Sequence, residues 1–380
     1  MTDDLTTTAE KLIPLLSEHA AETEAAGRPA APALRAVREA GFLNLFAPAA
    51  LGGHQAGLAT AVDVFERLGR GCGSTAWVAM LASGGSYLAA LLGDEARADV
   101  WGDDPQAMVC GGFGPTGTAQ PVPGGFTVSG RWQPLSGVQD AQWAMVAVPE
   151  HGMVLLPVAD GEIEQTWQVA GMRGTGSHTL TVRDVFVPAH RVLSTSRMFA
   201  GGYAADHPGE PLYQAMPISL LSVAMLGPVL GMAQAALTTT LDRLARGKAI
   251  GGTVYRNATD SPAVRLGVAD AASRLDTARL HTDRAVRDVT AAQPSGGSLP
   301  VAGRARIRMD TAATVTAVRG AIQLLLDVNG ASVFASGQPL QRIWRDVEVA
   351  TRHQMVASDV SREVYGRALL GIEEQITPLF

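Results

Sequence analysis

The sequence predicts a mostly helical protein with one small β domain in its middle. Residues 1 to about 105 show the apolar spacing of amphipathic helices, and this spacing returns after residue 201 and continues to the end. Between residues 108 and about 193, short apolar runs alternate with Gly and Pro, which is typical of strands joined by turns. Strands and helices do not alternate along the chain, so neither a parallel sheet nor a Rossmann domain is predicted.

The length and composition favour several domains with buried cores. The chain has 380 residues, of which 47% are hydrophobic, and one ordinary domain is smaller than this. We therefore expect a helical N-terminal domain at residues 1–106, a β-barrel domain at 107–205 and a helical bundle at 206–380. Within the bundle, Pro294-Ser295-Gly296-Gly297-Ser298 predicts a loop between two long helices.

In the N-terminal domain, Val62, Phe65 and Leu68 recur at helical spacing. Thr7-Thr8-Ala9-Glu10 matches a capping box and predicts the start of a helix. The residues before it are polar and acidic and do not form an export signal, so we expect a cytoplasmic protein.

In the middle domain, apolar runs bounded by turn residues predict strands at 124–130, 143–148, 153–156 and 180–182. Their short length and spacing favour a small antiparallel sheet or barrel.

The bundle begins with a stretch that has no charged side chain between Glu210 and Asp242. Its length raises the question of a membrane span. Because Pro217, Gly227 and Pro228 interrupt it, we expect a helix buried among other helices, and no membrane contact.

Several classes of function are not indicated. The net charge is -6, and no Lys/Arg cluster suggests nucleic-acid binding. Cys72 and Cys110 do not make a disulfide framework, and the eight histidines lack metal-binding spacings, so no metal site is expected. Gly111-Gly112-Phe113-Gly114 is not followed by a helical pattern, as a dinucleotide-binding fingerprint requires.

The segment from Leu340 to His353 is the first candidate for an active-site wall, because it has the spacing of a helix. At about 100° per residue, Arg342, Asp346 and His353 fall on one stripe. A charged stripe that ends in a titratable histidine suggests a catalytic surface. The alternative is a structural Arg/Asp pair beside a histidine whose hydrogen bonds are satisfied.

Three other segments combine small residues with turns. Residues 130–137 (GRWQPLSG) run from a strand into a turn and place Ser136 at the strand end, and residues 171–179 (GMRGTGSHT) form a turn before a strand. Residues 46–53 (FAPAALGG) lead to residues 72–77 (CGSTAW). Closely spaced Gly, Ser and Thr let the backbone approach a flat ligand.

Taken in order, these motifs resemble the acyl-CoA dehydrogenase fold over nearly the whole chain. Within that fold they resemble the flavin-dependent monooxygenases that work with a separate flavin reductase. The matching pieces are Pro…Leu-Gly-Gly, Gly-x-Trp…Ser-Gly…Trp, Met-Arg-Gly-Thr-Gly-Ser and Arg-x-x-Arg-Asp. The resemblance implies an N-terminal helical domain, a middle β-barrel and a C-terminal four-helix bundle, assembled as a homotetramer.

The residue at the end of the candidate helix separates two branches of this fold. Acyl-CoA dehydrogenases of this type carry a catalytic glutamate in a Tyr-Glu-Gly sequence soon after Arg-Asp, whereas this chain has Arg352-His353-Gln354. The monooxygenase branch carries a histidine at this point. An acyl-thioester dehydrogenase with Glu348 or Glu363 as its base remains an alternative.

The resemblance implies two catalytic residues. Ser136 is expected to face N5 of a reduced flavin, which with O2 forms a C4a-(hydro)peroxide that survives only where water is excluded. Its alternative role is a turn serine bonded to its own backbone. His353 is expected to donate a proton to this peroxide or to accept one from a substrate hydroxyl or amine. Trp132, in the same motif as Ser136, is expected to contact the flavin.

The resemblance also places the rest of the cofactor. Arg246 matches the family's arginine that contacts flavin phosphate, often across a subunit interface, and its alternative role is a solvated cation at a helix end. The turn with Gly330, Ala331 and Ser332 resembles the segment that lies along the flavin's edge or tail. The expected cofactor is reduced FMN, with FAD as the second choice.

One segment departs from the family pattern. Several relatives have a substrate-facing histidine on the helix after the Ser-Thr-x-Trp segment, whereas residues 81–87 of this chain are LASGGSY. Either these small residues enlarge the pocket for a bulky substrate, or another group such as Tyr87 supplies the second donor. We expect Gly85, Tyr87 and Phe113 to line the substrate pocket.

The sequence therefore predicts the oxygenase component of a two-component flavin-dependent monooxygenase. Because no nicotinamide-binding pattern is present, a separate NAD(P)H:flavin reductase is expected to supply the reduced flavin. The expected substrate is an aromatic or polyketide-type small molecule of secondary metabolism, with N-hydroxylation of an amine or amino sugar as the alternative. A flavin-free helical scaffold is the non-enzymatic alternative.

Overall fold

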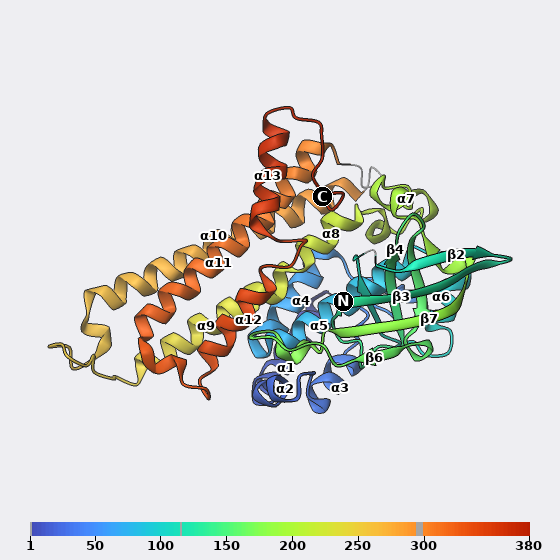
Figure 1. Ribbon diagram of the computed structural model, residues 1–380. Coiled ribbons are helices and arrows are strands. Elements are labelled where there is room, and N and C mark those ends of the chain that lie inside the picture. The colour runs from blue at the N-terminus through green and yellow to red at the C-terminus, as the bar shows by residue number, and fades with distance from the viewer. Residues whose placement is uncertain (1, 115, 294–298) are drawn as a thin grey trace.

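A computed structural model describes residues 2–114, 116–293 and 299–380, so the loop predicted at 294–298 lies outside the described residues. The sheets lie at one end of the molecule, and the long C-terminal helices extend away from them past the N-terminal helices (Figure 1). The predicted fold class, mostly helical with a sheet domain in the middle, is confirmed. The domain boundaries stay predictions, and every described strand lies between Val109 and Leu193.

The described part of the N-terminal domain contains six α-helices. They are α1 (Thr2–Glu18), α2 (Ala20–Ala26), α3 (Ala31–Glu39), α4 (Leu58–Gly71), α5 (Gly73–Ala90) and α6 (Asp94–Trp101). Of these, α2, α3, α4 and α6 contact the central α5, and α1 packs on α4. The central helix, α5, is buried on nearly every side because its residues are small or apolar throughout. The predicted helix start at Thr7 is wrong, since α1 already begins at Thr2.

The middle domain consists of two four-stranded sheets rather than one closed barrel. One sheet has the strand order β1-β4-β5-β8 and the other β2-β3-β7-β6. The strands are β1 (Val109–Gly112), β2 (Thr118–Val122), β3 (Gly125–Leu135), β4 (Trp143–Val148), β5 (Gly152–Pro157), β6 (Glu162–Glu164), β7 (His178–Pro188) and β8 (Val192–Leu193). The four predicted strands correspond to β3, β4, β5 and β7.

One strand pair contradicts the antiparallel prediction. β1 pairs with β4 in parallel, with Val109 opposite Trp143. The chain leaves β1, builds β2 and β3 in the other sheet, and only then returns to β4. This long connection allows a parallel pair, since a short hairpin joins only antiparallel strands.

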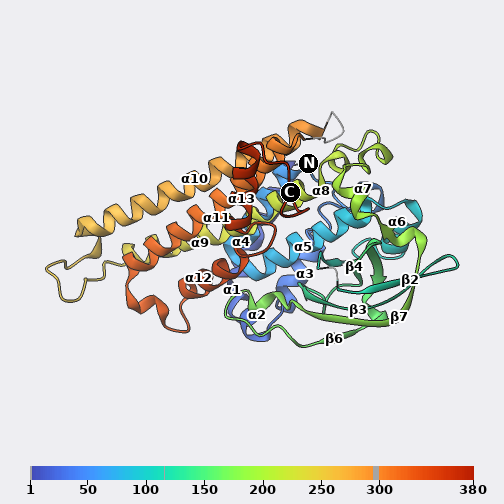
Figure 2. The same ribbon diagram turned by 45° about the horizontal axis from the view of Figure 1, so that its top comes forward.

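The C-terminal region is a long bundle (Figure 2). Its helices are α8 (Pro217–Ala224), α9 (Leu226–Ala245), α10 (Pro262–Ala292), α11 (Val301–Asn329), α12 (Pro339–Ala350) and α13 (Ser358–Leu369), and the short α7 (Thr195–Phe199) precedes them. α10 packs along α11, and α9 packs against both. The fourth position expected of the bundle is shared, because α12 packs on α9 and α13 packs on α11.

Short 3-10 helices connect these elements. They are η1 (Ala49–Leu51), η2 (Val158–Asp160), η3 (Arg173–Thr175), η4 (Ala189–Arg191), η5 (Ala204–Asp206), η6 (Pro211–Gln214), η7 (Ala258–Asp260) and η9 (Ala331–Phe334).

Two described helical segments, 217–245 and 301–329, are long and apolar enough to cross a membrane by length and composition. The first contains most of the uncharged stretch, and 83% of its apolar window is buried inside the protein. Packing among other helices therefore accounts for its apolar character, as predicted.

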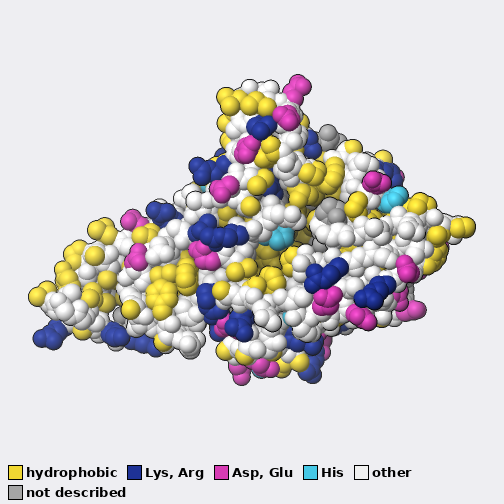
Figure 3. All heavy atoms as spheres, in the orientation of Figure 1, with side chains coloured by type: hydrophobic (Ala, Val, Ile, Leu, Met, Phe, Trp, Pro, Cys, Tyr) yellow, Lys and Arg dark blue, Asp and Glu magenta, His cyan; other side chains and the backbone are white. Residues whose placement is uncertain are grey.

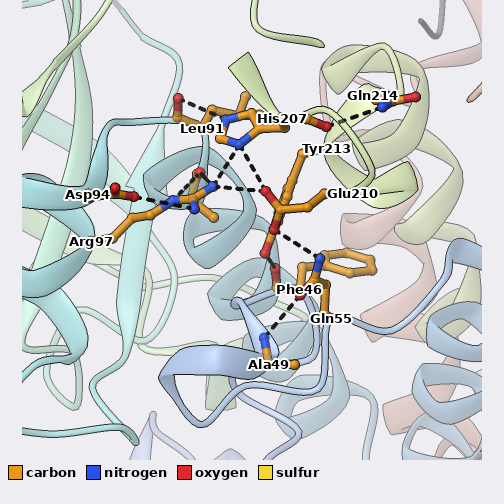
Figure 4. Close-up of polar contacts among 11 residues, drawn as sticks. Phe46, Ala49, Gln55, Leu91, Asp94, Arg97, His207, Glu210, Tyr213 and Gln214 are labelled. Carbon is orange, nitrogen blue, oxygen red and sulfur yellow. Dashed lines mark hydrogen bonds and ion pairs between the residues drawn. The ribbon is translucent and has the colours of Figure 1, made fainter. Parts of the chain in front are cut away.

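A cluster of polar contacts fastens the connection between β8 and α8 to the N-terminal domain (Figure 4). Arg97 of α6 donates to Nδ1 of His207 at 2.9 Å and lies 3.9 Å from Oε2 of Glu210. Tyr213 stacks at an angle on the His207 ring and donates its hydroxyl to the carbonyl oxygen of Phe46 at 2.8 Å. The cluster thus fixes the segment that leads into α8.

Candidate active site

A cavity of about 360 Å³ lies where α5, β1, the end of β3, the α8–α9 region and the turn after α12 meet. Hydrophobic side chains gather in a hollow between the C-terminal helices and the β domain (Figure 3). The cavity is lined by Met80, Leu81, Gly84, Gly85, Leu88, Gly111, Gly112, Phe113, Gly114, Gln133, Pro134, Ser136, Leu221, Met225, Arg352, His353, Gln354 and Met355. Four predicted site residues, namely Ser136, His353, Gly85 and Phe113, therefore share one cavity.

Ser136 follows the last residue of β3 directly and is buried. Its Oγ lies 2.7 Å from Oγ of Ser177, which in turn lies 2.6 Å from Oγ1 of Thr175. Thr175 donates its hydroxyl to the carbonyl oxygen of Met172 at 2.8 Å. Ser136 is therefore the end of a chain of hydroxyls, and the alternative of a turn serine bonded to its own backbone is wrong.

The direction of the hydrogen bonds in this chain follows from counting protons. Each hydroxyl has one proton, and that of Thr175 is used on Met172. Ser177 must then donate to Thr175, and Ser136 must donate to Ser177. Ser136 is left with lone pairs facing the cavity, so it offers an acceptor to a ligand.

His353 lies beyond the helix that was predicted to carry it. α12 ends at Ala350, so the prediction of a continuous helix to His353 is wrong. The amides of Arg352 and His353 bond the carbonyls of Val349 and Ala350, three residues back, and these tighter bonds end the helix. The turn brings the imidazole against Trp77 of α5, with the ring centroids 5.9 Å apart.

The hydrogen bonds of His353 define its neutral tautomer. The backbone N–H of Met355 donates to Nδ1 at 3.3 Å, so the proton of the neutral ring is on Nε2. Burial lowers the pKa of His353 to about 4, and the charge of Arg308 acts in the same direction. The histidine is thus neutral near pH 7, and Nε2, which has no partner among the described residues, can donate a hydrogen bond.

Asp346, the other titratable residue of the predicted stripe, has a structural contact outside the cavity. It is buried, and its carboxylate accepts the backbone N–H of Met172, the residue whose carbonyl ends the hydroxyl chain. Burial raises the pKa of Asp346 to about 6. α12 is therefore joined through one residue, Met172, to the turn that orients Ser136.

The cavity lining contains no carboxylate among the described residues. Glu348 lies outside the lining and pairs with Arg319 and Arg352, at 3.2 Å and 2.5 Å. Glu363, on α13, is paired with Arg367 at 3.0 Å. Neither glutamate is placed to act as the base of a dehydrogenase in this cavity.

Trp132 and Tyr87, two other predicted site residues, are not part of the lining. Trp132 is buried in the β domain and donates its indole N–H to the carbonyl oxygen of Ala147 at 2.7 Å, so the structure does not bring it to the cavity. Tyr87 lies on a face of α5 that packs against the N-terminal core, and its hydroxyl donates to the carbonyl oxygen of Ala215 at 2.9 Å. Because its hydroxyl proton is used on Ala215 and the side chain lies outside the lining, Tyr87 is not the missing second donor.

Three of the four remaining predicted cofactor residues line a second cavity, of about 680 Å³, at the other end of α12. It contains Gly330, Ala331 and Ser332, but the predicted Arg246 is exposed and is not part of its lining. Arg243, one turn earlier on α9, takes this place instead. It donates to Asn329 at 3.0 Å, Gln338 at 2.9 Å and Ser332 at 3.1 Å, and these contacts were not evident from the sequence.

Comparisons with known proteins agree with this geometry. The chain matches the family models of the acyl-CoA dehydrogenase N-terminal domain over residues 6–102 and of the acyl-CoA dehydrogenase C-terminal domain over residues 223–358. It is 32% identical to the flavin-dependent monooxygenase oxygenase subunit HsaA of Rhodococcus jostii, covering 96% of this chain and 97% of the relative. This chain is a flavin-dependent monooxygenase of the acyl-CoA dehydrogenase fold.

A second sequence relative and a solved structure are similar to this monooxygenase over nearly their whole length. The monooxygenase is 33% identical to the oxygenase component of the FADH(2)-dependent resorcinol hydroxylase of a Rhizobium species, over 94% of this chain and 92% of the relative. The structure of XiaF from a Streptomyces species in complex with FADH2 and glycerol has a TM-score of 0.94 and 32% identity, over 99% of this chain and 97% of that chain.

A reduced flavin fits the residues of the monooxygenase's cavity. N5 of a reduced flavin carries a proton, and Ser136 offers the lone pair that this proton needs. Ser177 and Thr175, which give Ser136 its direction, lie in a motif that the sequence singled out, but only their folded positions show their contact with Ser136. The predicted use of reduced flavin agrees with the cofactors named for its relatives.

Proposed function

We propose that this chain is an oxygenase component that receives reduced FMN or FAD from a separate NAD(P)H:flavin reductase and hydroxylates an aromatic small molecule with O2. The observation that carries the proposal is one cavity that pairs an acceptor hydroxyl with a neutral histidine and has no carboxylate among its described lining residues. Abstraction of an α-proton needs a base, whereas oxygen chemistry needs a protected flavin N5 and a hydrogen-bond donor.

The side chains of the cavity have separate tasks in this proposal. When bound, the reduced flavin supplies the electrons that activate O2. Ser136 would accept a hydrogen bond from the flavin N5–H and so keep the proton on N5, and the apolar wall of Leu88, Leu221 and Met225 excludes water. His353 donates from Nε2 to a substrate oxygen and orients the ring for reaction.

An aromatic substrate is favoured by the apolar wall and by the relatives, among them a resorcinol hydroxylase. The glycine-rich sides of the cavity leave room for a ring system larger than a single phenol. We therefore propose a polyketide-type compound of secondary metabolism as the substrate. We also propose that the reaction takes place in the cytoplasm.

The second cavity supports a homotetramer in this proposal. α12 separates it from His353 by its whole length, about 18 Å at the usual helical rise. Arg243, Lys248 and the Gly330–Ser332 turn suit the phosphate or adenosine of a flavin nucleotide. We propose that a neighbouring subunit brings this cavity to the flavin held by Ser136.

The proposal is tested by adding the purified protein to a generic flavin reductase, NADH, O2 and a panel of phenols, with FMN and FAD compared in parallel. We expect hydroxylated product that depends on both flavin and protein, and a His353→Gln variant that makes at least tenfold less. No product from any phenol or amine, together with bleaching of bound FAD by an acyl-CoA, would establish the dehydrogenase instead.

A further inference from the structure

Arg308 is a buried cation with no acidic partner. It lies on α11 with 1% of its surface exposed, and no carboxylate of the described residues forms an ion pair with it. Asp310, two residues along the helix, pairs instead with His281 and Arg284. Burying an unpaired charge is costly, so a retained one calls for a specific role.

The contacts of Arg308 are backbone oxygens of the turn that carries His353. Its guanidinium donates to the carbonyl oxygen of Met355 and, at 3.2 Å, to that of Gln354. The Gln354 carbonyl and the Met355 N–H belong to the same peptide group. That N–H is the donor to Nδ1 of His353, so one peptide lies between the guanidinium and the imidazole.

A cation at the oxygen of a peptide strengthens the N–H of that peptide as a donor, because hydrogen bonds in a chain polarise one another. The strengthened N–H favours the tautomer in which Nδ1 accepts and Nε2 carries the proton. The same positive charge opposes protonation of the ring.

We infer that Arg308 is a positioning residue for His353, which holds the imidazole neutral and with its proton on Nε2 through the Gln354–Met355 peptide. The effect of Arg308 on turnover rests on the proposed function. Its effect on the proton state of His353 is independent of that function and can be measured without flavin.

The other groups around His353 do not supply this effect. On the adjacent chain segment, Arg352 is exposed and neutralised by Glu348 of α12 at 2.5 Å. From α5 the ring meets Trp77, which is uncharged, and on the cavity side Ser136 has no charge. Burial is the larger cause of the lowered pKa of His353, and Arg308 of α11 is the charged group that acts in the same direction.

The test is NMR of isotopically labelled histidine in the full protein, with His353 assigned by its loss in His353→Gln. In the wild type we expect Nε2 protonated and Nδ1 unprotonated down to about pH 5. In Arg308→Met the pKa of the ring should rise but stay below its ordinary value of about 6.5, because burial still lowers it, and the ring should populate both tautomers. Arg308→Lys keeps the charge but loses the two-oxygen fork, so it should keep a low pKa and show tautomer exchange.

Arg304→Met is the control, because Arg304 also lies on α11, is partly buried and donates to a backbone oxygen, that of Phe380 at 3.5 Å. It should lower stability without changing the His353 signals. Thermal unfolding shows whether each variant is folded. A folded Arg308→Met whose His353 signals match the wild type, or a wild type with its proton on Nδ1, would overturn the inference.

If the proposed function holds, the acid limb of the pH profile of turnover should also move to higher pH in Arg308→Met. An altered NMR titration with no turnover in any variant would leave the positioning intact and refute the proposed function alone.

Discussion

At the scale of single residues, the direction of a hydroxyl decides what Ser136 offers to a ligand. Thr175 donates its hydroxyl proton to the Met172 carbonyl. Ser177 must therefore donate to Thr175, and Ser136 must donate to Ser177. The sequence showed these residue types in two small motifs, but no pattern of residue types gives the direction of hydrogen bonds between segments about forty residues apart.

Thr175→Val removes the group that sets this direction while keeping the shape of the side chain. Ser177 can then donate to Ser136, which turns the Ser136 proton toward the cavity and against the flavin N5–H. We expect a several-fold rise in hydrogen peroxide released per product formed, measured in the reductase-coupled assay. Thr166→Val is the control, because the Thr166 hydroxyl bonds Thr179 at 2.7 Å outside the cavity lining. Equal uncoupling in both variants would contradict the assignment.

The neighbouring glycines of α5 have different tasks. A Cβ at Gly84 would meet only the flexible end of Leu221, at 3.1 Å, whereas a Cβ at Gly85 would lie 2.2 Å from the backbone oxygen of Val109. Gly85 therefore permits the close packing of α5 on β1, and Gly84 leaves space in the cavity.

We expect Gly84→Ala to fold normally and to lose activity on large aromatic substrates more than on small ones. Gly85→Ala should be destabilised by about 1–3 kcal/mol, as is usual for overpacking. Thermal unfolding and product assays with phenols of increasing size check both. Two variants with the same stability and the same size preference would refute the distinction.

At the scale of elements, α12 connects the two cavities and is tied to the β domain by Asp346. The pKa of this carboxyl is about 6 in the folded protein against 3.8 for the unperturbed group, because burial outweighs the Met172 N–H and the nearby arginines. The folded state thus binds the proton more tightly than the unfolded chain. The contribution of Asp346 to stability is largest below about pH 4 and is lost as the pH rises through 6.

Asp346→Asn keeps an acceptor for the Met172 N–H and removes the titration. We expect the free energy of unfolding of the variant, relative to the wild type, to become more favourable as the pH rises from about 4 to 7. Denaturant unfolding at several pH values measures this difference. Parallel curves for the two proteins would show that Asp346 does not titrate in this range.

The order of the elements was predictable because apolar spacing and turn residues are local signals. The helices, the middle strands and the place of Ser136 at a strand end followed from them. The end of α12 at Ala350, before His353, could not be predicted from the sequence. A helix and a turn that follows it can carry polar residues at the same spacing, so the pattern does not show where the helix ends. Arg243, and not the predicted Arg246, contacts the turn after α11, because this depends on which side of α9 faces that turn. The burial of Tyr87 and Trp132 depends on packing partners that are distant in sequence.

At the scale of the whole molecule, the bundle projects from the rest of the chain (Figures 1 and 2). Leu266 and Leu280 of α10 are 65% and 69% exposed in the single chain. We expect another subunit of the proposed homotetramer to cover these two leucines.

In the proposed homotetramer, Leu280→Glu places a charge on this surface and should shift the assembly to smaller species. Light scattering of the wild type and the variant measures the change. Leu369→Glu is the control, because Leu369 is equally exposed, at 68%, but lies at the end of α13. A wild type that is already monomeric would refute the proposed assembly.

The central claim is that this cavity performs oxygen chemistry on an aromatic substrate. It is tested most directly by running the reductase-coupled reaction under isotopically labelled O2 and analysing the product by mass spectrometry. We predict that one labelled oxygen atom enters each hydroxylated product and that His353→Gln abolishes most of this incorporation. Product that carries oxygen from water, or an acyl-CoA that is desaturated without added reductase, would contradict the account.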